Sequence, residues 1–244
     1  MIAWFWPSQT IDSPCLLESV GAVLDLGVTP EDCFVAHSPE KPVSEDAQNI
    51  LRSQGIRFLE HDYAMRKNAH DIQTIAKTQL KALALANATH VLKIDSDTVI
   101  ARMDTIKKAH MMNTMAMAWA WPGSYFAGCC SLFRRDALDY LATTDFADLG
   151  GVFPGEDLAQ HYLLTRRFGF DAIQHNWHSS KGGFATGWFY DSSKRTLEEA
   201  ARLFEVVTFG NRKKIPKERG GCSAREYVAL TMARFRSVLR LACI

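Results

Sequence analysis

The chain has 244 residues, with 28 Lys and Arg residues against 27 Asp and Glu residues, which gives a formal net charge of +1. Apolar residues make up 47 % and charged residues 23 % of the sequence, as in ordinary globular proteins. This composition excludes a disordered chain, a collagen-like fibre and a highly charged nucleic-acid coat. The length allows a substantial buried core without disulfides or structural metals.

The first part of the chain, residues 1–94, alternates short apolar runs with amphipathic segments. The expected strands are residues 2–6, 33–37, 56–60 and 90–94, and the expected helices between them are residues 13–26, 43–53 and 68–86. In the last of these helices Ile72, Ile75, Ala76 and Leu83 recur at helical spacing. Such alternation predicts right-handed βαβ units and a parallel sheet.

The second part is less regular. Its expected strands are residues 114–120, 125–133, 170–177 and 204–209. One expected helix begins at residue 136, and two others cover residues 156–168 and 223–243. Glycines and aromatic residues gather in residues 181–190. We therefore expect an α/β fold with one mixed domain over residues 1–210, followed by a basic linker and an amphipathic helix over residues 211–244.

Cysteine usage and hydropathy bear on the compartment. The six cysteines form no Cys-x-x-Cys pair and no zinc-ligand spacing, which favours reduced thiols in a reducing compartment. No basic segment precedes the apolar run at residues 2–6, and no stretch reaches the ~20 apolar residues that span a bilayer. The sequence predicts a cytoplasmic chain.

A pair of carboxylates follows the expected strand at 90–94. Asp95 and Asp97 stand one residue apart, at a strand end of the kind where open α/β sheets bind ligands. Two carboxylates at this spacing can share Mg²⁺ or Mn²⁺, and such a cation neutralises phosphate oxygens. The alternative is a structural turn, for which Asp-x-Asp is common.

Two further segments follow this motif in a characteristic order. A Gly-containing strand runs into an arginine pair within residues 127–138, and an acidic pair, Glu156 and Asp157, opens a helix. Together with Asp-Ser-Asp they resemble the nucleotide-sugar-dependent glycosyltransferases of the GT-A fold, over roughly residues 1–190. The resemblance implies a Rossmann-like, mostly parallel sheet flanked by helices. It also implies transfer of a sugar from a nucleoside-diphosphate sugar to a glycan, lipid-linked or protein hydroxyl acceptor.

The resemblance also implies where the donor binds. The implied donor residues are Asp95, Arg66, Lys67 and Gly128 for the nucleotide, and Asp95, Asp97 and His178 for Mn²⁺ or Mg²⁺. His175 is the alternative third metal ligand, since neutral imidazole suits Mn²⁺ better than Mg²⁺. An ordinary polar strand end at 175–178 and a solvated helix start at 66–67 are the structural alternatives.

The acidic pair has two possible roles. Displacement at the anomeric carbon needs a base for the acceptor hydroxyl, and in inverting relatives the acid at this position is that base. We assign Asp157 as the base and Glu156 to orientation of the acceptor. In a retaining enzyme these acids would bind the acceptor instead. Carboxylates at a helix start also complement the helix dipole, so a structural role stays open.

The charge is unevenly distributed. Residues 212–240 hold nine basic and two acidic residues, a charge of +7, which leaves −6 for the rest of the chain. Arg225, Arg236 and Arg240 lie beside the apolar face of the expected C-terminal helix. They either pack against the acidic body or give peripheral contact with the inner face of an anionic membrane. No nucleic-acid-binding motif accompanies the charge, so no nucleic-acid partner is expected.

Two other functions remain open. Residues 95–99 also fit the Asp-x-Asp-x-Thr/Val signature of haloacid-dehalogenase-like phosphohydrolases, with Asp95 as the nucleophile. That signature usually follows the first strand, whereas here it follows the fourth expected strand. The third hypothesis is a non-catalytic module that binds a sugar nucleotide without turnover.

Overall fold

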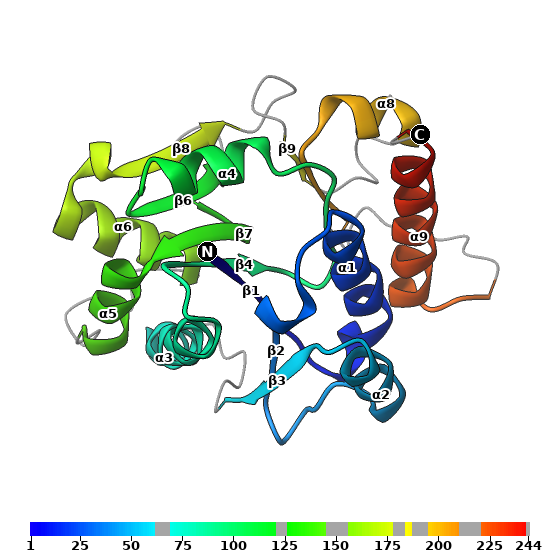
Figure 1. The fold of residues 1–244 in the computed structure, drawn as a ribbon, viewed down its shortest axis with the longest axis horizontal. Helices are drawn as coiled ribbons and strands as arrows, with labels where there is room; N and C mark the ends of the chain where they lie inside the picture. The colour runs from blue at the N-terminus through cyan, green and yellow to red at the C-terminus, as the bar shows by residue number, and fades with distance from the viewer. Residues whose placement is uncertain are drawn as a thin grey trace.

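The structure is a computed structural model that describes residues 1–61, 69–120, 126–144, 156–177, 184–186, 195–209 and 221–242. In this part of the chain a seven-stranded sheet is covered by helices on both faces, and a second, three-stranded sheet and the C-terminal helix lie at one edge (Figure 1). None of the described helices is long and apolar enough to cross a bilayer.

The large sheet is mostly parallel. Its strands are β1 (Ile2–Pro7), β2 (Cys33–His37), β3 (Arg57–Glu60), β4 (His90–Ile94), β6 (Ala116–Ala120), β7 (Phe126–Arg134) and β8 (Ile173–Trp177), in the order β3-β2-β1-β4-β7-β6-β8. The first four strands of this order run parallel, and β8 runs parallel to β6. β7 runs antiparallel to both β4 and β6. The sheet confirms the Rossmann-like arrangement expected from the strand–helix alternation.

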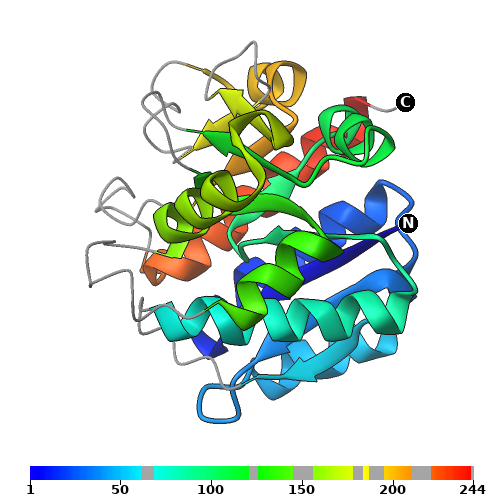
Figure 2. The ribbon, with the colours of Figure 1, turned by 90° about the vertical axis from the view of Figure 1, so that its left-hand side faces the viewer.

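Helices form a layer on each face of this sheet. α3 (Ala69–Ala86), α5 (Arg135–Thr143) and α6 (Glu156–Phe168) cover one face, and α1 (Ser13–Asp25), α2 (Glu45–Ser53) and α4 (Asp104–Met111) cover the other. Figure 2 shows α3 and α5 side by side along the first face. In β1, Ala3 and Phe5 join the first layer while Trp4 and Trp6 join the second. The apolar run near the start of the chain is therefore a strand buried on both faces.

The second sheet consists of β5 (Thr98–Ile100), β10 (Val206–Thr208) and β9 (Phe184–Thr186), with β10 in the middle. It shares an apolar core with α1, α8 (Leu197–Leu203) and α9 (Ala224–Ala242). α9 packs beside α1 at the edge of the molecule (Figure 1). The core residues on α9 are Val228, Ala229, Met232 and Phe235, which are the buried face of the expected amphipathic helix.

The expected elements up to β4 agree with the structure to within a few residues. β5, α4, α8 and β9 were not expected, because each is short or lies among glycines and polar residues. The expected strand at 170–177 was wrong for its first residues, since Phe170–Ala172 form a 3₁₀ turn. Gly169, with φ of 87°, turns the chain there, a conformation that L side chains disfavour. The five described cysteines are free thiols.

Buried hydroxyl groups connect the elements beneath the expected metal site. The Trp6 indole Nε1 donates to Ser19 Oγ at 2.9 Å, and Ser19 Oγ donates to the Thr98 carbonyl oxygen at 2.5 Å. Ser96 Oγ donates to Ser8 Oγ at 3.0 Å. These hydrogen bonds join β1, α1 and the turn between β4 and β5. They therefore hold the backbone that carries Asp95 and Asp97 in place.

Candidate active site

The Asp-Ser-Asp segment forms a tight turn between β4 and β5. The backbone N–H of Thr98 donates to the Asp95 carbonyl at 3.0 Å, which closes the turn. The Asp95 N–H donates to the carbonyl of Cys129 at 2.9 Å, and the Asp97 carbonyl accepts from the N–H of Phe209 at 2.8 Å. Because neighbouring strands hold the backbone on both sides, both carboxylates leave from a fixed position at the carboxyl end of β4.

Lys93 lies at the centre of the site. Its side chain points to the same face of β4 as that of Asp95, two residues on, and only 4 % of the residue is exposed. The ammonium nitrogen Nζ donates to the Gly128 carbonyl at 2.8 Å and to Glu156 Oε1 at 3.1 Å, and it lies 3.3 Å from Asp95 Oδ1. One buried cation thus links the Asp-x-Asp turn to the acidic pair of α6.

Gly128 and Asp157 touch directly. The Gly128 N–H donates to Asp157 Oδ2 at 3.1 Å. A Cβ atom at position 128 would collide with the carboxyl group of Asp157, so a larger residue there would displace that carboxyl group. Glu156 and Asp157 are the first two residues of α6, where the helix dipole favours negative charge. Asp95, Glu156, Asp157 and Gly128, which the sequence singled out separately, are therefore gathered around Lys93.

Two carboxyl groups of this cluster, those of Asp95 and Asp157, have raised pKa values. Burial raises the pKa of Asp95 to about 7, with Lys93 opposing and the charges of Asp97, Asp157 and Glu156 adding to the rise. The side chain of Asp95 is nevertheless 42 % exposed, so a ligand can reach it from solvent. Burial also raises the pKa of Asp157 to about 6; Lys93 opposes this rise, and the charge of Glu156 adds to it.

The second carboxylate of the motif has a different partner. Arg225, from the first turn of α9, places Nη1 2.7 Å from Asp97 Oδ2 and Nη2 2.7 Å from Asp12 Oδ1. The side chains are 16 %, 14 % and 8 % exposed for Arg225, Asp97 and Asp12. The C-terminal helix thus contributes a guanidinium group to the site. Arg236 and Arg240, further along this helix, pair with Asp25, the last residue of α1.

The charges of these groups do not balance. Five carboxylates, those of Asp12, Asp95, Asp97, Glu156 and Asp157, face the two cations Lys93 and Arg225. The excess of negative charge adds to the rise that burial causes in the pKa values of Asp95 and Asp157. The ion pair of Asp95 with Lys93 and that of Asp97 with Arg225 each involve one carboxylate oxygen. The hard oxygen donors of this turn suit Mg²⁺ or Mn²⁺, and a divalent cation would offset most of the excess charge.

The remaining expected site residues are Arg66, Lys67, His178 and the alternative ligand His175. Arg66, Lys67 and His178 lie outside the described residues. The alternative ligand His175, on β8, has its Nε2 2.8 Å from Nε2 of His161 on α6, and its ring stacks on Phe170. Within the described ranges no group of three or more His, Cys, Asp and Glu side chains is arranged to hold a metal ion.

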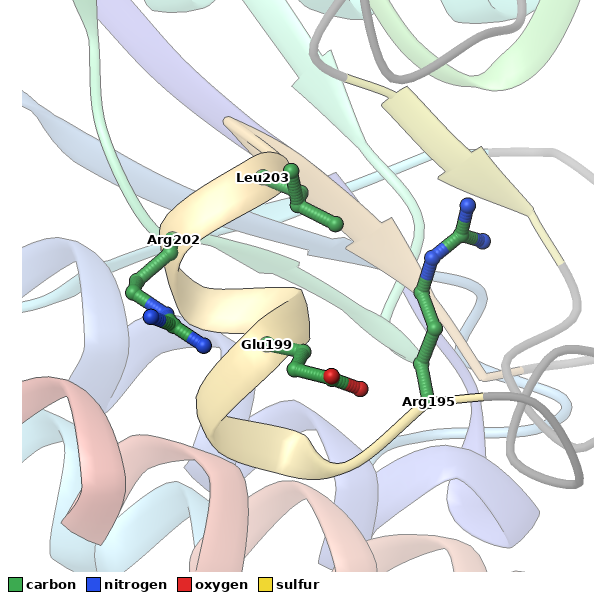
Figure 3. Close-up of a pocket in the computed structure, with 4 residues that line it drawn as sticks. All are labelled: Arg195, Glu199, Arg202 and Leu203. Carbon is green, nitrogen blue, oxygen red and sulfur yellow. The ribbon is translucent and has the colours of Figure 1, made fainter.

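A separate pocket of about 450 Å³ lies along α8. It is lined by Arg195, Glu199, Arg202 and Leu203 (Figure 3). The Glu199 carboxylate accepts from the Thr196 N–H at 2.9 Å and so caps the start of α8. None of these four lining residues belongs to the acidic cluster around Lys93.

Lys93, Arg225 and Asp12 were not recognised from the sequence as site residues. For Lys93 a signal existed, because a lysine inside the apolar strand Val-Leu-Lys-Ile needs a buried partner. For Arg225 the sequence predicts a place beside the apolar face of the C-terminal helix, against the acidic body or facing a membrane, but it indicates no individual partner. Nothing local to Asp12 or Arg225 indicates that they meet near residue 97, since these contacts join distant parts of the chain.

The comparisons with known proteins bear on the fold. No protein-family model matches the sequence, and no curated protein matches it. Among solved structures, an active-site mutant of LgtC matches at 12 % sequence identity with a TM-score of 0.56, over 96 % of this chain and 95 % of that one. Galactosyltransferase LgtC in complex with donor and acceptor sugar analogues matches at 13 % identity with a TM-score of 0.53, over 97 % and 95 % of the two chains.

A third similar structure is a glycosyltransferase involved in the glycosylation of the major capsid of PBCV-1. It matches at 11 % identity with a TM-score of 0.50, over 95 % of this chain and 98 % of that one. At these identities the likeness concerns the fold, and it extends over nearly the whole length of each chain. The protein therefore has the GT-A fold of nucleotide-sugar glycosyltransferases, as the order of its motifs implied.

Proposed function

We propose that this protein is a metal-dependent glycosyltransferase that moves a sugar from a nucleoside-diphosphate sugar to a hydroxyl acceptor. The observation that carries the proposal is the meeting of Asp95, the first carboxylate of the Asp-x-Asp turn, with the acidic pair Glu156 and Asp157 around buried Lys93 at the carboxyl end of β4. In open α/β sheets ligands bind at this end of the strands. The similar LgtC structure in complex with donor and acceptor sugar analogues supports the same substrate class.

Asp95 and Asp97 would hold Mn²⁺ or Mg²⁺, together with His178. When bound, the cation neutralises the charge that develops on the departing nucleoside diphosphate. Gly128 would border the donor, and Arg66 and Lys67 would contact its nucleotide. The excess of negative charge supports this assignment, because a site with fewer cationic than anionic side chains binds a divalent cation more readily.

Asp157 would act as the base. Its pKa of about 6 lies above the usual range for aspartate yet leaves the carboxylate ionised at neutral pH, which suits proton transfer from an acceptor hydroxyl. The Gly128 N–H fixes one of its oxygens. Glu156, held by Lys93, would orient the acceptor. If the enzyme retains configuration, no such base is needed, and both acids would bind the acceptor.

The acceptor is a glycan, a lipid-linked molecule or a protein, and the chain would act in the cytoplasm. Contact with the inner face of a membrane through α9 would depend on the exposed Arg234 and on residues 211–220, which lie outside the described residues. Arg225, Arg236 and Arg240 are paired with carboxylates of the body and contribute less to such a contact.

A thermal-shift screen tests the substrate class. The full chain is melted with each nucleoside diphosphate and its sugars, with and without Mn²⁺. A ligand at 100 times its dissociation constant stabilises by about 2.7 kcal/mol, and at roughly 2–4 °C per kcal/mol this raises the melting temperature by about 5–10 °C. The shift should require Mn²⁺ and disappear in Asp97→Ala. The matched control is Asp104→Ala, which removes an 85 % exposed carboxylate from α4.

No Mn²⁺-dependent shift with any nucleotide would contradict the proposal. A phosphoaspartate trapped at Asp95 would favour the phosphohydrolase instead. Tight binding of a sugar nucleotide with no product over hours would favour the non-catalytic module.

A further inference from the structure

The C-terminal helix reaches the Asp-x-Asp turn through one side chain. Arg225 bridges Asp97 and Asp12, with both nitrogen–oxygen distances at 2.7 Å. The Asp97 contact has hydrogen-bond geometry and spans 128 positions of the chain. The sequence motif predicts two carboxylates for a cation but gives no reason for an arginine beside one of them.

The local sequence fixes where Arg225 lies. α9 starts with a capping box, in which the Glu226 N–H donates to Ser223 Oγ at 3.2 Å and the Ser223 N–H donates to Glu226 Oε2 at 2.7 Å. Arg225 stands three residues before Val228, so it lies at the N-terminal end of the buried face of the helix. A cation in the first turn opposes the helix dipole, and the two carboxylates offset that cost.

α9 is firmly held against the body. Val228, Met232 and Phe235 are fully buried against it. Near the other end of the helix, Arg236 Nε lies 2.5 Å from Asp25 Oδ2, and Arg240 Nη2 lies 2.9 Å from Asp25 Oδ1. Because apolar packing and ion pairs hold α9 along its length, the helix keeps Arg225 in a fixed position beside Asp97.

We propose that Arg225 is a positioning residue for Asp97, and the proposal rests on the function proposed above. Its guanidinium holds Oδ2 of Asp97 and so fixes the rotamer in which Oδ1 serves as the cation ligand. Asp12 supports the guanidinium from its second side. The affinity of the site for a divalent cation therefore depends on the C-terminal helix.

Charge alone predicts the opposite effect. Replacing Arg225 by a neutral residue makes the acidic site more negative, which would strengthen cation binding if only charge mattered. If Arg225 merely blocked Asp97, its removal would strengthen cation binding as well. Only positioning predicts weaker binding after removal, because Asp97 would lose the contact that orders it. The sign of the change thus separates the explanations.

The test measures Mn²⁺ binding to the full chain, with free Mn²⁺ counted by electron paramagnetic resonance. Arg225→Met should raise the dissociation constant at least tenfold, within the range of about 10–100-fold for supporting partners of metal ligands. The dissociation constant of Arg225→Lys should lie between those of wild type and Arg225→Met, because an ammonium group is a point charge that lacks the two-pronged geometry of a guanidinium. The control Arg234→Met removes the same charge from an exposed position of α9 and should stay within twofold of wild type.

The outcomes separate this proposal from the function it rests on. Unchanged or tighter Mn²⁺ binding in Arg225→Met, with binding abolished in Asp97→Asn, would overturn positioning and leave the metal site standing. No Mn²⁺ binding by the wild-type chain would overturn both. Circular dichroism checks that each variant is folded. If Arg225→Met is unfolded, the test rests on Arg225→Lys. A wild-type affinity for Mn²⁺ in that variant would overturn the proposal.

Discussion

Replacement of Lys93 by Met removes the buried cation that links the two acidic pairs. Methionine keeps much of the length and the apolar stem, so the change isolates the ammonium group. Its loss leaves Asp95 and Glu156 without the charge that lies 3.3 and 3.1 Å from them, and it leaves the Gly128 carbonyl without a donor at 2.8 Å.

The magnitude follows from burial. The Lys93 side chain is 5 % exposed and that of Glu156 is 15 % exposed, so solvent screens the pair weakly. Breaking a buried ion pair by removing one partner costs about 3–5 kcal/mol. At roughly 2–4 °C per kcal/mol for a chain of this size, the melting temperature should fall by about 6–20 °C.

The loss should also depend on pH. Without the ammonium group the pKa of Asp95 rises further above its value in the unfolded chain, so the folded variant binds more protons than the unfolded one. Its stability then falls as the pH rises, and the deficit relative to wild type is smaller at pH 5 than at pH 8. Chemical denaturation at both pH values measures this, with Lys107→Met on the exposed side of α4 as the control. A deficit below about 1 kcal/mol, the value of a surface pair, would refute the central role of Lys93.

Three further changes test separate parts of the site and fold. Gly128→Ala places a Cβ against the Asp157 carboxyl group and should lower kcat at least tenfold; a variant with wild-type kcat would show that this close approach is dispensable. Asp157→Asn should lower kcat by about 10²–10⁴-fold and leave donor affinity unchanged. In the wild-type enzyme kcat should rise as the pH increases through about 6. A decrease of kcat below tenfold in Asp157→Asn would rule out Asp157 as the base. Burial lowers the pKa of His90 to about 4, so wild type should lose about 2 kcal/mol relative to His90→Gln as the pH falls from 7.5 to 5; parallel urea-unfolding stabilities would contradict this.

The fold could be predicted largely because its signals are local. The alternation of apolar runs and amphipathic segments predicts the strands and helices up to β4. β1 is recognisable as a continuous apolar run, because a strand buried on both faces carries apolar side chains at successive positions. The reversed direction of β7 follows from no local pattern, since it depends on which strands pair. β5 and α8 are too short for periodicity to distinguish them from loops.

The site was predictable in its residue types and less so in its contacts. Asp95, Asp97, Glu156 and Asp157 stand out by their order along the chain, and the structure gathers Asp95 with the acidic pair around Lys93. Their partners act over long separations, 63 positions from Lys93 to Glu156 and 128 from Asp97 to Arg225. Such pairings depend on tertiary packing, which a single sequence does not display.

The most direct measurement is sugar transfer from the donor identified by thermal shift, with product counted in the wild-type chain and in Asp97→Ala, with Mn²⁺ and after its removal by a chelator. We expect product only from the wild-type chain with Mn²⁺, and restored activity when Mn²⁺ is added back. Asp104→Ala should match wild type. Equal product from Asp97→Ala, or from the wild-type chain without any divalent cation, would contradict the account.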